Sequence, residues 1–299
     1  MLTTIVTFLY PGAEKWISSF HQSLLDQSDK NFNVIAFQDQ VSLELFFHPL
    51  DLDIEFVAIQ DASTPYEVRL KALEHLKKID NDSLFIFNDI DDQLAPERIK
   101  STKKIFQNEE VKFSFCDLSL MDKDGKIFTR NIWRERTPNT LSYHDFTDWN
   151  MIGFGNTAFR GSLIPQELIS YIAKVTAGDW FFFYCLLKQS NEKIYFLNED
   201  LVYYRQHDSN DAGLAGIRED RLLIEIKVKI QQFSAISSKY PDSEYGTKLS
   251  AYIKLEKFIQ NRSNRLIYLA KIKEFVRSDQ YWWEHIKTLE EVGLNDDKN

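Results

Sequence analysis

The sequence predicts an α/β protein with a mostly parallel sheet flanked by helices, followed by a C-terminal helical section. Short apolar runs alternate with amphipathic stretches from residue 3 to about residue 200, a pattern typical of strand–helix–strand units. One of these runs, Leu84–Phe87, is followed at once by three aspartates. Residues 218–290 are instead rich in Lys, Glu, Leu and Ile at helical spacing, which predicts two to four helices. We therefore divide the chain into residues 1–212 and residues 213–299.

The first elements are a strand, a helix and two further strands. A strand is expected over residues 3–10, and Pro11-Gly12 ends it. Strands are also predicted at residues 32–37 and 54–59, and a helix at about 65–78 leads to the apolar run at 84–87. The helix after the first strand has apolar residues at helical spacing: Trp16, Ile17, Phe20, Leu24 and Leu25.

The elements that follow the aspartates are shorter. Pro96 is expected in the first turn of a helix, where its missing N–H does no harm. Residues 111–115 predict a strand, and Lys123-Asp124-Gly125-Lys126 a hairpin turn rather than a calcium loop. Periodicity leaves residues 181–187 open as buried helix or strand, while 195–197 and 201–204 predict two short extended pieces.

Composition argues against several classes of protein. The formal charge of −9, from 36 basic and 45 acidic residues, disfavours a general nucleic-acid binder. Cys116 and Cys185 are too few and too far apart for a disulfide framework or a thiolate zinc site, and their apolar neighbours predict buried thiols. The N-terminus is typical of a strand rather than a signal peptide, and no apolar stretch reaches membrane-spanning length. These features favour a cytoplasmic protein.

Asp89, Asp91 and Asp92 form the most informative cluster. They are predicted to emerge at the C-terminal end of a buried strand, where open α/β sheets bind their ligands. Three close carboxylates repel one another unless a cation lies between them. Oxygen ligands at this density suit manganese (Mn²⁺) or magnesium (Mg²⁺), typically shared with substrate phosphates. From position alone, a solvated acidic loop that caps the next helix fits equally well.

The ordered motifs resemble the inverting glycosyltransferases of family 2, which have the nucleotide-sugar-binding GT-A fold, over roughly residues 3–210. The strand Thr4–Phe8, the phrase Ser23–Ser28, the aspartate Asp39 and the phrase Asp89-Ile-Asp91-Asp92 are similar to successive family motifs. Later phrases resemble the acceptor-side loop, the base motif and a closing phrase common among bacterial rhamnosyl- and related transferases: Gly155–Arg160, Gly178-Asp179-Trp180 and Leu201–His207. Gln38 and Gly178 stand where the family usually has carboxylates.

The resemblance implies transfer of a sugar from a UDP-, dTDP- or GDP-linked donor to a saccharide or lipid-linked saccharide acceptor, in bacterial surface-polysaccharide biosynthesis. It implies Asp179 as the general base, although the residue pattern alone favours an N-cap for a helix beginning at Trp180. The remaining roles are as follows: a metal site of Asp89, Asp91, Asp92 and His207; donor contacts from Thr7, Asp39, Arg69, Asp89 and Arg205; and an acceptor side of Gly155, Asn156 and Trp180.

Other interpretations stay open from the sequence. A phosphatase or phosphotransferase could use Asp89 as its nucleophile, and a non-catalytic protein could bind nucleotides or carbohydrates on the same scaffold. Trp282-Trp283, beside Tyr281, is compatible with a peripheral contact at the inner membrane face, but core packing of a terminal helix is favoured. A homodimer is neither predicted nor excluded.

Overall fold

The computed structural model describes residues 1–42, 52–207, 218–241, 243–277 and 280–294. The chain forms two compact units, each assembled from separate stretches of sequence. The first comprises residues 1–145, 152–172 and 186–208, and the second comprises residues 146–151, 173–185 and 209–299. The predicted boundary between residues 212 and 213 lies outside the described residues.

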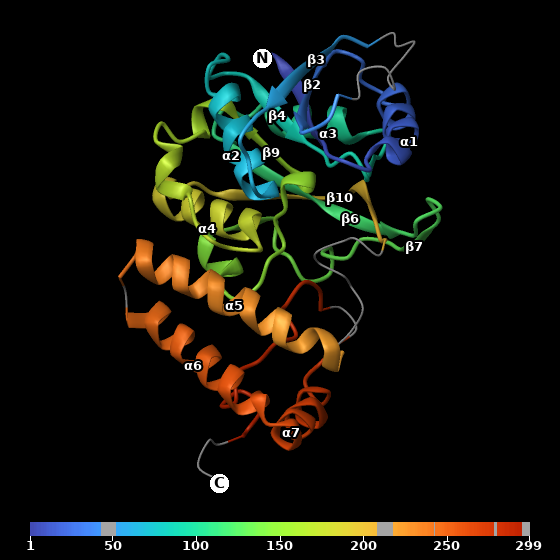
Figure 1. The fold of residues 1–299 in the computed structure, drawn as a ribbon. Helices are drawn as coiled ribbons and strands as arrows, with labels where there is room; N and C mark the ends of the chain where they lie inside the picture. Colours follow the sequence, from blue (N-terminus) through green and yellow to red (C-terminus); the bar gives the residue numbers. More distant parts are fainter. Residues whose placement is uncertain (43–51, 208–217, 242, 278–279, 295–299) are drawn as a thin grey trace. The chain divides into compact units, whose positions relative to one another are not determined.

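The first unit is built on one sheet, in which the described residues form ten strands (Figure 1). Its main order is β3-β2-β1-β4-β9-β6-β10-β5, with β7 paired to β6 and β8 paired to β10. The strands β1 to β4 are parallel, whereas β9 is antiparallel to both of its neighbours. The bounds are β1 Thr3–Leu9, β2 Asn33–Asp39, β3 Ile54–Ile59, β4 Leu84–Phe87, β5 Gln93–Leu94, β6 Phe113–Met121, β7 Ile127–Thr129, β8 Thr140–Leu141, β9 Thr157–Arg160 and β10 Ile194–Arg205.

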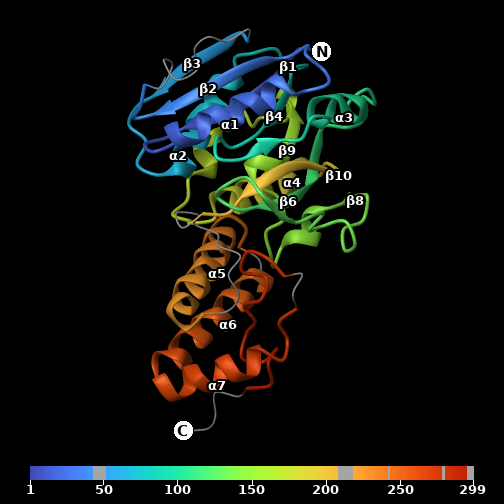
Figure 2. The same ribbon diagram turned by 90° about the vertical axis from the view of Figure 1, so that its right-hand side faces the viewer.

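Helices cover both faces of this sheet (Figures 1 and 2). The connection from β1 to β2 through α1 (Glu14–Leu25) and the one from β3 to β4 through α2 (Pro65–Leu76) run in opposite directions across the sheet. Because such crossovers are right-handed, α1 and α2 lie on opposite faces. α3 (Arg98–Ile105) shares the face of α1, where Ile17 and Phe20 pack with Ile5 and Ile99. The predicted helix-flanked, mostly parallel sheet is confirmed.

The second unit has a helical core. Its described residues include α5 (Glu219–Lys239), α6 (Ser243–Gln260) and α7 (Arg262–Ile272), in agreement with the prediction of two to four helices. Trp283 is buried and its ring stacks on that of Trp180, with centroids 6.1 Å apart. Core packing is therefore the correct interpretation of Trp283. No helix in the described part of the chain is long and apolar enough to cross a membrane.

Two elements differ from their predicted form or settle an ambiguity. Residues 194–205 form one strand instead of two pieces. Its pairing with β6 continues on both sides of an irregular stretch between Leu197 and Val202, where the register shifts as in a β-bulge. The ambiguous run at 181–187 belongs to α4 (Gly178–Ser190), whose residues from Trp180 to Leu187 are all buried. A helix buried on all sides has no amphipathic period, which is why its pattern was undecided.

Candidate functional site

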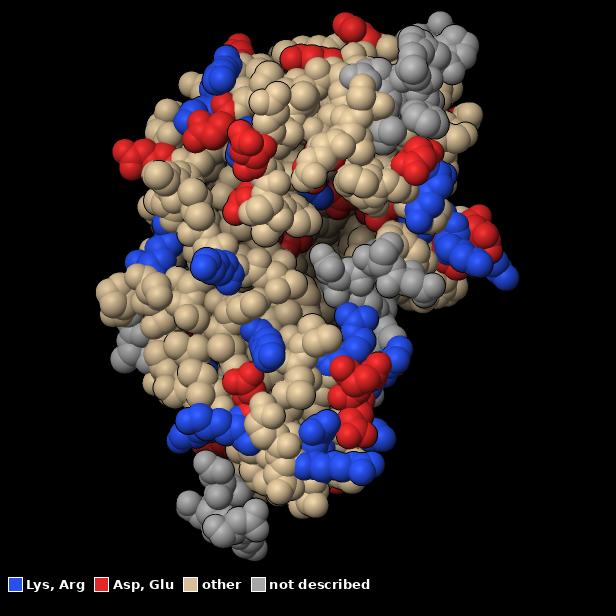
Figure 3. Space-filling model, in the orientation of Figure 1, with Lys and Arg blue, Asp and Glu red and all other residues tan. Residues whose placement is uncertain are grey.

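The acidic cluster lies where the chain reverses its direction across the sheet. β1 and β4 are adjacent and parallel, and the chain continues from β1 to β2 in one direction along the sheet and from β4 to β5 and β6 in the other. Their carboxyl ends therefore flank a crevice of the type in which open α/β sheets bind ligands. On the face shown in Figure 3, acidic atoms are recessed in a hollow, whereas most other charged side chains project outward.

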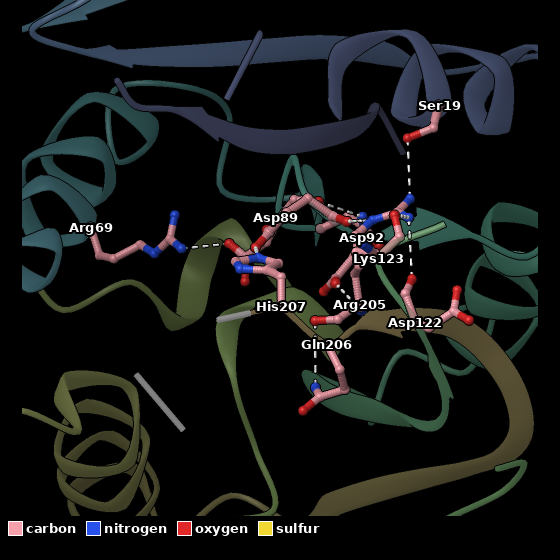
Figure 4. Close-up of polar contacts among 11 residues, drawn as sticks. Ser19, Arg69, Asp89, Asp92, Asp122, Lys123, Arg205, Gln206 and His207 are labelled. Carbon is pink, nitrogen blue, oxygen red and sulfur yellow. Dashed lines mark hydrogen bonds and ion pairs between the residues drawn. The ribbon is translucent and has the colours of Figure 1, made fainter. Parts of the chain in front are cut away.

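Asp89 forms an ion pair with Arg69, which reaches the cluster from α2 (Figure 4). The guanidinium carbon of Arg69 also lies 3.5 Å from the ring centroid of Phe8, a residue of β1. Burial raises the pKa of Asp89, the charge of Arg69 opposes this shift and that of Asp91 adds to it. Arg69 was predicted to neutralise the charge of a donor phosphate, and in this structure it pairs with the carboxylate of Asp89.

Asp91 and His207 form a second pair. His207 Nε2 lies 2.9 Å from Asp91 Oδ2, and both side chains are largely buried. The hydroxyl of Tyr10, directly after β1, donates a hydrogen bond to Asp91. Burial, followed by the charges of Asp91 and Asp89, raises the pKa of Tyr10. The sequence alone predicts no role for Tyr10, because its contact depends on the pairing of β1 with β4.

Asp92 is 1% exposed and accepts a hydrogen bond of 2.8 Å from the backbone N–H of Arg205. Burial, with the neighbouring charges of Asp91 and Asp89, raises its pKa well above the usual range. Asp92 is therefore part of the framework that joins the β4 loop to the end of β10.

Arg205 serves the same framework. Its side chain, in a residue 2% exposed, donates from Nε to the carbonyl of Asp91 at 2.7 Å, from Nη1 to the carbonyl of Lys123 at 3.0 Å and from Nη2 to Ser19 Oγ at 3.2 Å (Figure 4). These partners come from the β4 loop, the β6–β7 turn and α1. The predicted contact of Arg205 with donor phosphates stays a prediction, and the observed contacts indicate a positioning role.

The described residues contain no group of three or more His, Cys, Asp or Glu side chains placed to hold a metal ion. The separate partners of the carboxylates explain this, since Asp89 is held by Arg69 and Asp92 by the backbone of Arg205. Asp91 and His207 nevertheless bring two possible metal ligands together, a carboxylate oxygen and an imidazole nitrogen. A Mg²⁺-type ion commonly takes one or two protein ligands and completes its shell with phosphate oxygens and water. The residues fit such a shared site and do not fit a site made by protein alone.

Of the predicted acceptor-side residues, Gly155 lies against the acidic cluster. It belongs to the 3₁₀ turn Phe154–Asn156, and a Cβ added to it would lie 2.8 Å from Asp89 Oδ2. Only glycine allows so close a backbone approach. Asn156 is buried and fixes the turn, since Oδ1 accepts from Gly153 N at 2.9 Å and Nδ2 donates to the carbonyl of Cys116 at 3.2 Å.

The predicted nucleotide contacts Thr7 and Asp39 lie in different environments. Asp39 is half-buried at the C-terminal end of β2, beside the end of β1. Thr7 is fully buried within β1, and its hydroxyl has no hydrogen-bond partner among the described residues. Asp39 therefore lies at the carboxyl end of its strand, whereas Thr7 lies inside β1, next to the residue paired with the end of β4. Both nucleotide contacts stay predictions.

Asp179 and Trp180 belong to the second unit, in the first turn of α4. Asp179 Oδ1 accepts a hydrogen bond of 2.8 Å from the backbone N–H of Trp180. Trp180 is fully buried and donates from its indole nitrogen to the carbonyl of Phe146 at 2.8 Å. The predicted N-cap is wrong, because α4 begins at Gly178 and Asp179 therefore lies inside its first turn. The role of Asp179 as a base stays a prediction.

Asp117 is a structural carboxylate that the sequence analysis missed. It is fully buried in β6 and accepts from the backbone N–H groups of Leu118, Trp133 and Arg134 at 2.8, 2.9 and 3.0 Å. Burial raises its pKa to about 6 in spite of these bonds. The available signal was an aspartate inside the apolar run Phe115-Cys-Asp-Leu118.

Solved structures show which fold family this architecture represents. TarS 1–349 of S. aureus in complex with UDP matches 85% of this chain and 71% of its own, with a TM-score of 0.58 and 15% identity. The fold is GT-A. The UDP-GlcNAc complex of TarS 1–349 gives a TM-score of 0.59 at 14% identity, covering 88% of this chain and 74% of its own. A third structure, of S. aureus TarS 1–349, gives a TM-score of 0.56 at 15% identity and also covers 88% of this chain and 74% of its own.

These matches confirm the glycosyltransferase-like GT-A fold predicted from the motifs. No protein-family model and no curated protein matches the sequence. In this GT-A sheet, only Asn88 separates the end of β4 from the phrase Asp89–Asp92.

Proposed function

We propose that this protein is a glycosyltransferase that uses a nucleotide-diphosphate sugar as donor. The observation that carries the proposal is the cluster of Asp89, Asp91 and Asp92 with Arg69 and His207 at the switch point of a GT-A sheet. The TarS structures with UDP and UDP-GlcNAc support a UDP-linked donor as the first candidate. The acceptor is proposed to be a saccharide or lipid-linked saccharide, in cytoplasmic synthesis of a bacterial surface polysaccharide.

The donor diphosphate would bind beside Asp91, His207 and Arg69. We propose that Asp91 and His207 hold Mn²⁺ or Mg²⁺ together with the phosphates. Such an ion would neutralise the charge that develops on the leaving diphosphate. Arg69 can exchange its contact with Asp89 for a phosphate oxygen, because a guanidinium pairs equally well with either group. Asp39, at the end of β2, is the proposed contact for the nucleoside.

Asp179 is proposed to take the proton from the acceptor hydroxyl as it attacks the anomeric carbon. Attack in one step, opposite the leaving group, inverts the configuration at that carbon. The hydrogen bond from Trp180 N fixes the orientation of the carboxylate. Gly155 would let the acceptor side of the pocket approach Asp89 closely.

Calorimetric titration with UDP, dTDP and GDP, each with and without Mn²⁺, tests the donor site. We expect one nucleotide to bind with Mn²⁺, and Asp91→Asn to weaken that binding at least about tenfold, since a charged ligand to the cation is lost. The matched control is Asp82→Asn, because Asp82 is an exposed aspartate of the loop before β4. Equal binding by wild type and Asp91→Asn would contradict the metal assignment.

Turnover separates the remaining alternatives. Asp179→Asn should retain nucleotide binding and lose sugar transfer if Asp179 is the base. Nucleotide binding by the wild type without transfer to any saccharide acceptor would favour the non-catalytic protein. Labelling of Asp89 by beryllofluoride would favour the phosphatase, for which the GT-A fold provides no support.

A further inference from the structure

Trp16 of α1 contacts the side chains of the candidate site as well as its own helix. Its indole ring stacks on the imidazole of His207, with centroids 5.4 Å apart and ring planes inclined by 26°. The guanidinium carbon of Arg205 lies 4.6 Å from the centroid of the same indole. Trp16 is one of the apolar residues at helical spacing in this helix, and it is only half-buried.

The position of Trp16 follows from the start of α1. The helix begins at Glu14, and Ile17 and Phe20 occupy its buried face. Trp16 lies at the edge of that face, and Ser19, one turn further, accepts a hydrogen bond from Arg205. The N-terminal half of α1 is thereby joined to the end of β10.

His207 needs such support because it lies beyond the end of β10, two residues after Arg205. Its Nε2 points to Asp91 at 2.9 Å, and its ring lies against Trp16. Contacts between stacked rings are favourable beyond the area that they bury. A hydrogen bond at one edge of the imidazole and a stacked ring on its face together restrict both of its side-chain torsions.

We infer that Trp16 is a positioning residue of the donor site, acting through His207. It holds the imidazole with Nε2 toward Asp91, so that the pair is ordered before a nucleotide diphosphate and its cation arrive. Immobilising a side chain when a ligand binds costs conformational entropy. Side chains that are already ordered in the folded protein do not add this cost to binding. This inference rests on the proposed function, because it assigns Trp16 to the same site.

The test compares Trp16→Ala with Trp16→Phe by titration of UDP in the presence of Mn²⁺. We expect Trp16→Ala to raise the Kd about five- to tenfold and Trp16→Phe to stay within about twofold, since phenylalanine keeps a ring for His207. Without Mn²⁺, the Kd for UDP should be the same in both variants and in wild type. Phe128→Ala is the control, since Phe128 is a 57% exposed ring of β7 in the same unit.

A double-mutant cycle with His207→Ala separates positioning from general stability. If Trp16 acts through His207, Trp16→Ala should have no further effect on the Kd in the His207→Ala background. An equal effect in both backgrounds overturns the inference. If Trp16→Ala does not fold, Trp16→Leu replaces it, because leucine preserves apolar cover without a stacking face.

The outcomes also distinguish this inference from the proposed function. A wild-type protein that binds none of the three nucleotides, with or without Mn²⁺, overturns both. A wild-type protein that binds UDP with Mn²⁺, together with an unchanged Kd in Trp16→Ala, overturns the role of Trp16 alone.

Discussion

At the scale of single residues, the three aspartates of the cluster have three different partners. Asp89 is paired with Arg69, Asp91 with His207, and Asp92 with the backbone of Arg205. The first two partners are side chains whose polar nitrogens are of a kind that can also bind a ligand. The third is a backbone group in a strand, so Asp92 is expected to contribute to the framework more than to binding.

Gly155 provides a prediction at this scale. A methyl group there would lie 2.8 Å from Asp89 Oδ2 and 3.5 Å from Asp92 Oδ2, so Gly155→Ala must displace the Asp89 carboxylate. We expect the free energy of unfolding to fall by about 1–2 kcal/mol, as is usual for overpacking, and nucleotide binding to weaken. Urea denaturation and titration with UDP and Mn²⁺ measure the two effects.

Gly246→Ala in α6 is the matched control for Gly155→Ala. A Cβ at residue 246 meets no atom within 4 Å, so the same change should stabilise the helix by up to about 1 kcal/mol. Nucleotide binding should not change. A Gly155→Ala protein as stable and as competent in binding as wild type would contradict the close packing of Gly155 on Asp89.

The aspartates could be predicted from the sequence, and so could Arg69, His207 and Arg205 as residues of the same site, whereas the contacts of Tyr10 and Trp16 could not. An acidic phrase after an apolar run is a local signal, and so is the position of Asp39 after β2. Tyr10 and Trp16 reach Asp91 and His207 only because β4 and β10 bring distant residues beside β1 and α1. Contacts of that kind depend on strand order, which one sequence does not specify.

At the scale of elements, α5 connects the parts of the second unit through a buried lysine. Lys229 is 1% exposed, donates to the carbonyl of Asp148, and has its Nζ 5.4 Å from the ring centroid of Trp180 and 5.5 Å from that of Tyr252. Burial lowers the pKa of Lys229 to about 8. The amine thus joins α5 to the 146–151 stretch and to the start of α4, where Asp179 lies.

This pKa predicts how stability depends on pH. Between pH 8 and the ordinary lysine pKa of about 10.4, the unfolded chain binds a proton that the folded protein does not, so stability rises with pH. Relative to Lys229→Met, the wild type should gain about 2 kcal/mol in the free energy of unfolding between pH 7.5 and 9.5. Urea denaturation at both pH values measures this difference.

Lys227→Met is the control, since Lys227 is exposed on the same helix. Its stability should change with pH in the same way as that of wild type. If Lys229→Met also follows the wild-type pH dependence, the amine of Lys229 is not buried in solution as it is in this structure.

Elements with a clear period were predictable, and those without one were not. The strand at residues 54–59 has its predicted bounds, and the helix predicted at about 65–78 ends two residues earlier. Pro65 in the first turn and the side chain of Thr64, which accepts from Glu67 N, explain the start of α2. The short strands β5 and β8 had no signal, because pairing with β10 alone defines them.

At the scale of the whole molecule, the two compact units should respond differently to a donor ligand. The acidic cluster belongs entirely to the first unit. We expect calorimetry to show two unfolding transitions, of which UDP with Mn²⁺ at one hundred times its Kd raises only one. A ligand at that concentration contributes about 2.7 kcal/mol, which corresponds to a shift of roughly 5–10 °C.

In Asp91→Asn, binding that is about tenfold weaker lowers the ligand's contribution to about 1.4 kcal/mol, so the same ligand concentration should shift that transition by about half as much or less. A single transition would mean that the two units unfold together, and equal shifts of two transitions would contradict a ligand effect confined to the first unit. The absence of any shift in wild type would agree with a protein that binds no nucleotide.

The place of β9 in the sheet has a consequence for synthesis of the chain. β9 lies between β4 and β6, but its residues 157–160 are translated after both of them. The nascent protein therefore carries two open strand edges until residue 160 has left the ribosome. Such edges readily pair with other chains. These two facing edges stay unpaired while the residues between the end of β6 at Met121 and the end of β9 at Arg160, about forty in number, are added.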